Sequence, residues 1–127
     1  MENRNLFERW GIFRKGLKAD DIQESFANHL EYSLSKDRYT ATMRDLYQSL
    51  ALSIRDRMIE QWIRTQQHYH NHDIKRVYYL SAEYLMGRAL TNNLINLEIY
   101  DEGKKAVEGL GLDLEDLADE EPDAGLG

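Results

Sequence analysis

The sequence predicts a mainly α-helical fold of long helices with one short strand. Two observations predict it. Apolar residues recur at every third or fourth position along most of the 127 residues, which is the spacing of one face of a helix. The chain also contains a single proline, a residue that disrupts helix interiors. Hydrophobic residues make up 42% and charged residues 31% of the chain, which is typical of one globular domain rather than of a disordered segment.

The first helix is predicted from residue 19 to residue 35, with Asp20 or Asp21 capping its start. Its apolar stripe consists of Ile22, Phe26, Leu30 and Leu34. Residues 1–18 have no clear apolar period, but several of them are large and apolar. We therefore expect them to form an N-terminal arm that packs on another surface. A polar turn over residues 36–38 ends the first helix.

A second and longer helix is predicted to begin at a capping box of Thr42 and Asp45 and to reach about His70. About 28 residues at roughly 1.5 Å each give it a length of roughly 40 Å. Two apolar stripes run along it, one of Tyr47, Leu50, Ala51, Ile54, Met58 and Trp62, the other of Leu52, Ile59 and Ile63. A helix that is apolar on two sides needs cover on both. So short a chain can hardly supply that cover, which indicates a missing body or a partner.

Residues 71–73 end the second helix, and residues 77–80, Val-Tyr-Tyr-Leu, predict a short buried strand. A single strand has no neighbour for its N–H and C=O groups, which again indicates that part of the fold is missing. Three shorter helices are predicted to follow, over residues 89–97, 101–109 and 113–118.

The charge of the chain is unevenly distributed. Residues 113–123 hold seven acids and no base, whereas the remaining 16 acidic residues equal the 16 lysines and arginines in number. The sequence therefore predicts a neutral body with one acidic strip, interpreted as solvated helix surface. It has no clustered basic face of the kind that nucleic-acid binding requires. Cysteine is absent, the start does not resemble a signal peptide, and no apolar run could span a membrane. A cytoplasmic protein without membrane contact is expected.

Three segments together resemble one protein family. They are residues 62–69 (WIRTQQHY), 75–88 (KRVYYLSAEYLMGR) and 121–127 (EPDAGLG). In order and spacing they resemble the N-terminal region of the glycogen and starch (α-glucan) phosphorylases, glycosyltransferase family 35, and the likeness extends over most of the chain. Residues 19–127 would then be an incomplete portion of the phosphorylase N-terminal domain.

The resemblance implies, for a longer parent enzyme, an α/β fold of two domains in the GT-B arrangement. Such an enzyme uses pyridoxal phosphate, bound through a lysine of its C-terminal domain, together with inorganic phosphate. It releases the terminal α-1,4-glucosyl unit of an α-glucan as glucose 1-phosphate. The cofactor lysine and the second wall of the cleft lie outside these 127 residues, so the chain alone is expected to bind no cofactor and to be inactive. The alternative is a stand-alone helical module for interaction or dimerisation, without catalysis.

Two residues match positions that line the catalytic cleft of the family, although no catalytic site is complete in this chain. Glu83 matches a residue near the sugar end of the cleft. An alternative is that Glu83 pairs with Arg88 and fixes the turn after the strand. Gly127 ends a Gly-rich run that continues, in the family, into an Asn-Gly-Gly-Leu-Gly loop. The backbone N–H groups of such a loop can meet an anion or a sugar oxygen.

The resemblance also implies an effector face at a subunit interface. The candidate residues are Asp37, Arg38, Arg64, Gln66, Gln67 and His70. A homodimer is expected through the Lys36–Tyr47 region and the helix end at 62–70. His70 stands where the family's animal members have a tyrosine that stacks on the nucleotide base, and no Ser or Thr precedes Ser25. We therefore expect a weak or absent response to AMP and no N-terminal phosphorylation switch. An alternative is that the arginines form ion pairs with Asp37 or Asp45.

Two further sets of residues admit a functional and a structural interpretation. His68 and His72 are spaced i, i+4 and could share a metal ion, but no third ligand stands at a useful spacing. The favoured interpretation is that both are polar residues near the negative end of the helix dipole, and no metal is expected. Trp62, Tyr78 and Tyr79 resemble a sugar-stacking platform, but their spacing favours core packing.

Overall fold

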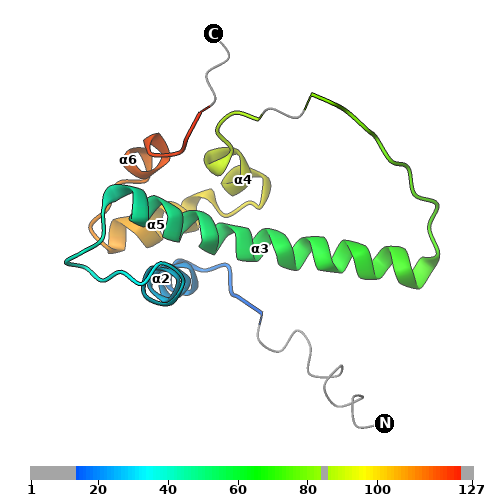
Figure 1. The fold of residues 1–127 in the computed structure, drawn as a ribbon. Coiled ribbons are helices and arrows are strands. Elements are labelled where there is room, and N and C mark those ends of the chain that lie inside the picture. The colour runs from blue at the N-terminus through cyan, green and yellow to red at the C-terminus, as the bar shows by residue number, and fades with distance from the viewer. Residues whose placement is uncertain (1–13, 84–85, 124–127) are drawn as a thin grey trace.

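The computed structural model describes residues 14–83 and 86–123. Its centre is one long helix, α3 (Met43–His72), and the other helices gather around the N-terminal half of α3 (Figure 1). In chain order the elements are α2 (Ala19–Asn28), the π-helix η1 (His29–Ser33), α3, α4 (Leu90–Asn96), α5 (Tyr100–Gly109) and α6 (Leu114–Asp119). The predicted mainly helical fold is confirmed.

The first predicted helix is present, but it changes character before it ends. Ile22, Phe26 and Leu30 form the predicted stripe and are buried. The last five residues are a π-helix, in which the N–H of Leu34 donates to the carbonyl of His29, five residues earlier, at 3.0 Å. The chain then leaves the helix at Ser35, whose φ of 56° lies in the left-handed region. At the start of α2 the Asp21 carboxylate accepts from the backbone N–H of Lys18 at 3.2 Å, so the predicted capping by an aspartate is confirmed for Asp21.

Helix α3 begins and ends as the sequence predicts. The N–H of Thr42 donates to the Asp45 carboxylate at 3.0 Å, and the N–H of Asp45 donates to the Thr42 hydroxyl at 3.2 Å. This reciprocal pair satisfies two of the N–H groups that a helix start leaves free. Asp73 follows the last helical residue in the left-handed conformation, with φ at 47°. That conformation turns the chain away from the helix axis.

The core lies between the N-terminal half of α3 and the helices packed on it. Helix α2 contacts α3 and α5, while α4 and α6 each contact both α3 and α5. The three short C-terminal helices are confirmed within one or two residues of their predicted ends. Gly103 lets α5 and α4 approach closely, because a Cβ there would lie 2.9 Å from the Leu94 side chain. The buried apolar residues are Ile22, Phe26, Leu30, Leu50, Ile54, Leu90, Leu94, Ile99, Ala106, Val107, Leu114 and Leu117.

The predicted buried strand at 77–80 is wrong for this chain. Residues 74–83, called here the extended segment, leave the far end of α3 and return toward α4 without strand pairing (Figure 1). Val77 is 90% and Leu80 92% exposed. The physical reason is that no described residue supplies a neighbouring strand for the N–H and C=O groups of residues 77–80. Core packing of Trp62, Tyr78 and Tyr79 is wrong as well, since all three are exposed.

Candidate functional site

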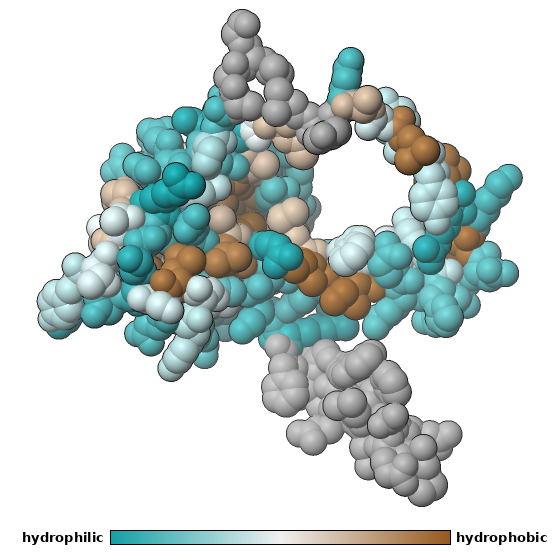
Figure 2. Space-filling model, in the orientation of Figure 1, coloured by the Kyte–Doolittle hydropathy of each residue, from teal (hydrophilic) through white to brown (hydrophobic). Residues whose placement is uncertain are grey.

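The distal part of α3 and the extended segment together expose a row of apolar side chains. Hydrophobic colour gathers along the helix and on the arch that the extended segment forms beside it (Figure 2). The exposed large apolar residues here are Met58, Trp62, Ile63, Ile74, Val77, Tyr78, Tyr79 and Leu80. Soluble proteins rarely leave so many apolar side chains together in water, so a surface of this kind marks a place of contact.

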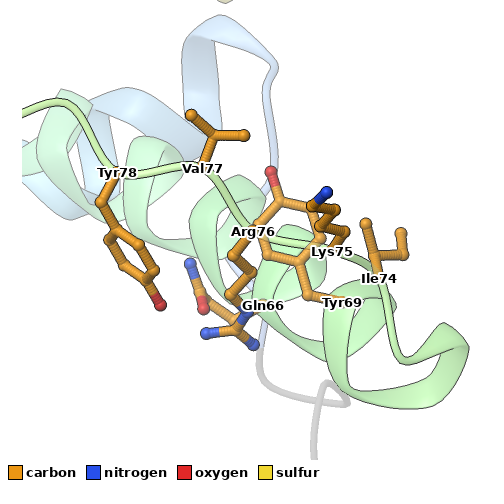
Figure 3. A pocket seen from close by; sticks show the side chains of 7 residues that line it. All are labelled: Gln66, Tyr69, Ile74, Lys75, Arg76, Val77 and Tyr78. Carbon is orange, nitrogen blue, oxygen red and sulfur yellow. The ribbon is translucent and has the colours of Figure 1, made fainter.

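A hollow of about 400 Å³ lies where the extended segment turns back over the end of α3. Gln66 and Tyr69 reach it from the helix, and the side chains of residues 74–78 reach it from the other side (Figure 3). The Arg76 guanidinium lies 5.4 Å from the centre of the Tyr69 ring. Cations, phenol rings and an amide can bind an anion or an aromatic group, and the lining residues include no histidine or carboxylate that could act as a general base. The hollow therefore has the chemistry of binding.

The structure brings only one of the predicted effector residues to this hollow. Gln66 lines it, whereas Arg64, Gln67 and His70 are exposed on α3 and do not line it. Asp37 and Arg38 lie before the other end of α3. At 1.5 Å per residue, the helix separates them from Arg64 by roughly 30 Å. Within one chain these residues do not form one site.

Asp37 and Arg38 have local partners in the loop between η1 and α3. The Asp37 carboxylate accepts hydrogen bonds from the Thr40 hydroxyl and from the N–H groups of Thr40 and Tyr39, each at 2.9 Å. These hydrogen bonds, led by the one from the Thr40 hydroxyl, lower the pKa of Asp37. Arg38 donates to the Tyr39 hydroxyl and lies 4.7 Å from the centre of that ring. The predicted alternative, an ion pair of Arg38 or Arg64 with Asp37 or Asp45, is not found among the described residues. The Asp37 carboxylate accepts from Tyr39 and Thr40, and the Asp45 carboxylate accepts from Thr42.

Glu83, the first candidate for the catalytic cleft, is exposed at the end of the extended segment. Its backbone N–H donates to the Ser81 hydroxyl at 3.0 Å. The alternative interpretation, a pair of Glu83 with Arg88, is wrong: Arg88 forms its ion pair with Asp119, at 3.7 Å. The second candidate, Gly127, lies outside the described residues.

Glu121 is a functional candidate that the sequence interpretation missed. Its carboxylate accepts from the N–H of Ala89 at 2.7 Å and from the N–H of Leu90 at 3.0 Å. Its carbonyl accepts from Nε of Arg88 at 3.0 Å. The interpretation of the acidic strip as solvated surface therefore does not hold for Glu121. One signal could have indicated this contact: α4 begins after an alanine, which cannot cap a helix.

Arg57 was also missed, although it is 1% exposed. Its guanidinium donates to the Ser25 hydroxyl at 2.9 Å, to the Ser53 carbonyl at 2.8 Å and to the Gly16 carbonyl at 3.0 Å. Nη2 has no hydrogen-bond partner. Burial lowers the pKa of Arg57. The signal was its position, three residues after Ile54 on the buried stripe of α3.

His29 bridges a serine and an aspartate, an arrangement that could be mistaken for a nucleophilic triad. Its Nδ1 lies 2.8 Å from the Ser33 hydroxyl and its Nε2 lies 2.7 Å from the Asp56 carboxylate. Nucleophilic catalysis also needs N–H donors for the oxyanion. The N–H of Leu34, next to Ser33, already donates to the His29 carbonyl. The geometry supports a structural bridge between η1 and α3.

The described residues give no support for a metal or cofactor site. They contain no group of three potential metal ligands, and the rings of His68 and His72 stack with their centres 4.2 Å apart. Pyridoxal phosphate is bound through a lysine that a desolvating pocket makes reactive. None of the six lysines of this chain is buried in such surroundings. Among the described helices, none has the length and apolarity needed to cross a membrane.

The fold and its surfaces thus define a helical segment in which one half of α3 is covered by other helices and the other half exposes apolar side chains. No protein-family model matches the chain. It is 50% identical over 107 residues to the brain form of human glycogen phosphorylase, which is 84% of this chain and 13% of that protein. The bovine brain form gives the same values, and the rat muscle form is 50% identical over 109 residues. The chain thus spans 13% of the length of these relatives and is similar to one segment of a glycogen phosphorylase.

Proposed function

We propose that this chain is a segment of an α-glucan phosphorylase of glycosyltransferase family 35. In the longer enzyme, the terminal α-1,4-glucosyl unit of an α-glucan is transferred to inorganic phosphate and leaves as glucose 1-phosphate. The observation that carries this proposal is the 50% identity to glycogen phosphorylases over 84% of the chain. A match of that length is far more specific than a short motif.

The uncovered half of the molecule supports a role as framework inside a larger body. In the proposed GT-B enzyme, the extended segment finds neighbouring strands and the distal stripe of α3 finds cover. Both would remove apolar side chains from water. Glu83 and Gly127 line the catalytic cleft at the ends of this framework, and a lysine elsewhere in the enzyme binds pyridoxal phosphate. The 127-residue chain alone is inactive.

The proposal extends to how the enzyme is assembled and where it works. It forms a homodimer through Lys36–Tyr47 and the 62–70 end of α3, and it is cytoplasmic. The separation of Arg38 from Arg64 supports the dimer, because only a second chain could bring an Arg38 to an Arg64. Dimerisation would also cover Tyr39 and Met43, which are exposed on this chain.

The test measures release of glucose 1-phosphate from glycogen and inorganic phosphate, with pyridoxal phosphate added. The samples are the 127-residue chain and a chain of the same gene continued beyond Gly127. We expect release by the continued chain alone. A continued chain without phosphorolysis would overturn the proposed enzyme. Release by the short chain would overturn its inactivity, and a stop codon directly after Gly127 would favour the stand-alone interaction module.

A further inference from the structure

The backbone of the extended segment is unpaired over its apolar part. Within the described part of the chain, the N–H and C=O groups of residues 75–80 form no backbone–backbone hydrogen bond. Residues 77–80 are Val, Tyr, Tyr and Leu, types that favour β-strands, and Val77 and Tyr79 are each 90% exposed. Open space separates this arch from the helical body (Figure 2). An exposed apolar segment with free backbone groups is a template for pairing with another chain.

The sequence of the extended segment is complementary to itself in one antiparallel register. When Tyr79 lies opposite Tyr79 of a second copy, Lys75 lies opposite Glu83 of that copy, and Tyr78 lies opposite Leu80. Aromatic pairs and opposite charges in directly opposed positions stabilise antiparallel strands. Lys75 and Glu83 are both exposed and form no ion pair within the described residues. Because such a contact is twofold symmetric, each of these pairs occurs twice.

The orientation of the side chains leaves the pairing edge accessible. Arg76 and Tyr78 extend toward Gln66 of α3, whereas Val77 points to the other side (Figure 3). Side chains alternate between the two faces of a strand, so even-numbered residues face α3 and odd-numbered residues face away from it. In the register centred on Tyr79, odd residues lie opposite odd residues. The α3 helices of both copies then lie on the same face of the two-stranded ribbon, outside the plane in which the strands pair.

A turn at the end of the extended segment indicates which residues would exchange hydrogen bonds. The N–H of Glu83 donates to the Ser81 hydroxyl at 3.0 Å, and that hydroxyl donates to the Glu83 carbonyl at 3.1 Å. The backbone groups of Glu83 are therefore already engaged. Opposed pairs in an antiparallel ladder alternate between hydrogen-bonded and non-hydrogen-bonded. If Glu83 belongs to a non-hydrogen-bonded pair, so does Tyr79, four residues earlier, and the Cα atoms of such a pair are about 4.5 Å apart.

We propose that two copies of the 127-residue chain pair antiparallel through residues 76–82. The two Tyr79 side chains meet on the twofold axis, and an ion pair of Lys75 with Glu83 forms at each end. This interface differs from the one proposed above for the longer enzyme, where the strands of the larger body would take up the same backbone groups. The inference concerns the 127-residue chain and does not rest on the proposed function.

Cysteine cross-linking tests the register, because the chain itself contains no cysteine. Tyr79→Cys places two thiols opposite each other, at a Cα separation that a disulfide can bridge. Val77→Cys is the matched control: Val77 is equally exposed, but its two copies lie four residues apart along the ribbon, roughly 13 Å. During air oxidation, followed on non-reducing gels, Y79C should form the covalent dimer at least about tenfold faster than V77C. Equal rates, or no dimer from Y79C, would overturn the proposal.

Charge reversal tests the two ends of the pairing without changing Tyr79. Lys75→Glu puts like charges opposite each other twice in the dimer and should raise its Kd about tenfold, measured by sedimentation equilibrium. The double variant with Lys75→Glu and Glu83→Lys restores opposite charges and should return the Kd to within about threefold of the unmodified chain. Lys105→Glu, the same change at an exposed residue of α5, should leave the Kd unchanged.

Three results of the charge reversal would contradict the pairing. A double variant as weak as Lys75→Glu would show that Lys75 does not face Glu83. Equal effects of Lys75→Glu and Lys105→Glu would show that only the net charge matters. An unmodified chain that stays monomeric throughout the measured concentrations would show that the extended segment does not pair at all.

Discussion

The two halves of α3 have the same apolar spacing but different surroundings. Leu50 is fully buried, and Ile54 and Arg57 on the same face are nearly so. Only two turns further on, Trp62 is 62% and Ile63 46% exposed. The first half is covered by α2, α4 and α6, whereas among the described residues the second half has beside it the extended segment and, at Glu60, the backbone of Lys15 (Figure 1). The comparison teaches that an apolar period marks a face suited to burial, while the cover itself must come from other parts of the fold.

The largest expected effect comes from truncating one aliphatic side chain in each half. Leu50→Ala should lower the free energy of unfolding by about 3 kcal/mol, because it leaves a cavity in a packed core. Ile63→Ala, the matched variant on the exposed half of the same helix, should change it by less than about 0.5 kcal/mol. Urea unfolding of the 127-residue chain measures both. Equal losses would mean that the distal half is covered in solution.

The Ile63→Ala variant can also be tested in the longer enzyme, where the distal half of α3 can have other surroundings than in the 127-residue chain. If the remainder of a phosphorylase covers the distal half of α3, Ile63→Ala should there cost about 2 kcal/mol, as expected of a buried aliphatic residue. The irreversible loss of activity on heating follows stability in large proteins and can be measured in the same preparations. An Ile63→Ala enzyme as stable as the wild type would show that this face stays open.

The next largest effect on stability is expected from the buried Arg57 in the covered half of α3. Arg57→Ala removes three hydrogen bonds to Ser25, Ser53 and Gly16 and should destabilise the chain by about 2 kcal/mol. Arg55→Ala, two residues away on the exposed side, should have an effect below about 0.5 kcal/mol. Burial removes the Arg57 guanidinium from water, which lowers its pKa, and it leaves Nη2 without a partner. If Arg57→Ala leaves the free energy of unfolding almost unchanged, this cost of desolvation cancels the three hydrogen bonds.

These contacts also mark how far the sequence could predict the fold. Helix ends were predictable wherever the signal is local, as in the capping box of Thr42 and Asp45, because a cap needs only residues three apart. The Arg57 contact to Gly16 spans 41 residues and the Glu121 cap of Ala89 spans 32. Neither leaves a periodic signal, so neither was predicted. The strand prediction at 77–80 failed for the same reason: pairing depends on residues far away in sequence or outside this chain.

A smaller effect is expected from acid at the start of the covered half. The hydrogen bond from the Thr42 backbone is the main cause that lowers the pKa of Asp45, so the folded state favours the charged carboxylate. Its stabilisation is present above the unfolded-state pKa of about 3.9 and is lost as pH falls through the lower folded-state pKa. Urea unfolding between about pH 6 and pH 3 should therefore show falling stability.

The acid dependence can be assigned with one variant and its control. Asp45→Asn keeps one acceptor oxygen but does not titrate, so the fall in stability below about pH 4 should be smaller than in the unmodified chain. Glu24→Gln, on the exposed side of α2, should leave the slope unchanged. Identical slopes for Asp45→Asn and the unmodified chain would show that other carboxylates cause the dependence.

The smallest expected effect concerns the effector face on the uncovered half. His70 is exposed on α3 and does not line the hollow that Gln66 and Tyr69 form, and its imidazole offers a nucleotide base a smaller ring to stack on than a tyrosine would. We therefore predict that AMP activates the longer enzyme by less than about twofold, below the roughly 5–150-fold range typical of allosteric coupling. Initial rates with and without AMP measure this. His70→Tyr replaces the imidazole with the larger phenol ring and should increase the response, whereas His72→Tyr, on the next part of the same exposed helix end, should not. Strong activation of the unmodified enzyme would show that the distal half binds the nucleotide without residue 70, and would move the effector site toward the hollow at Gln66.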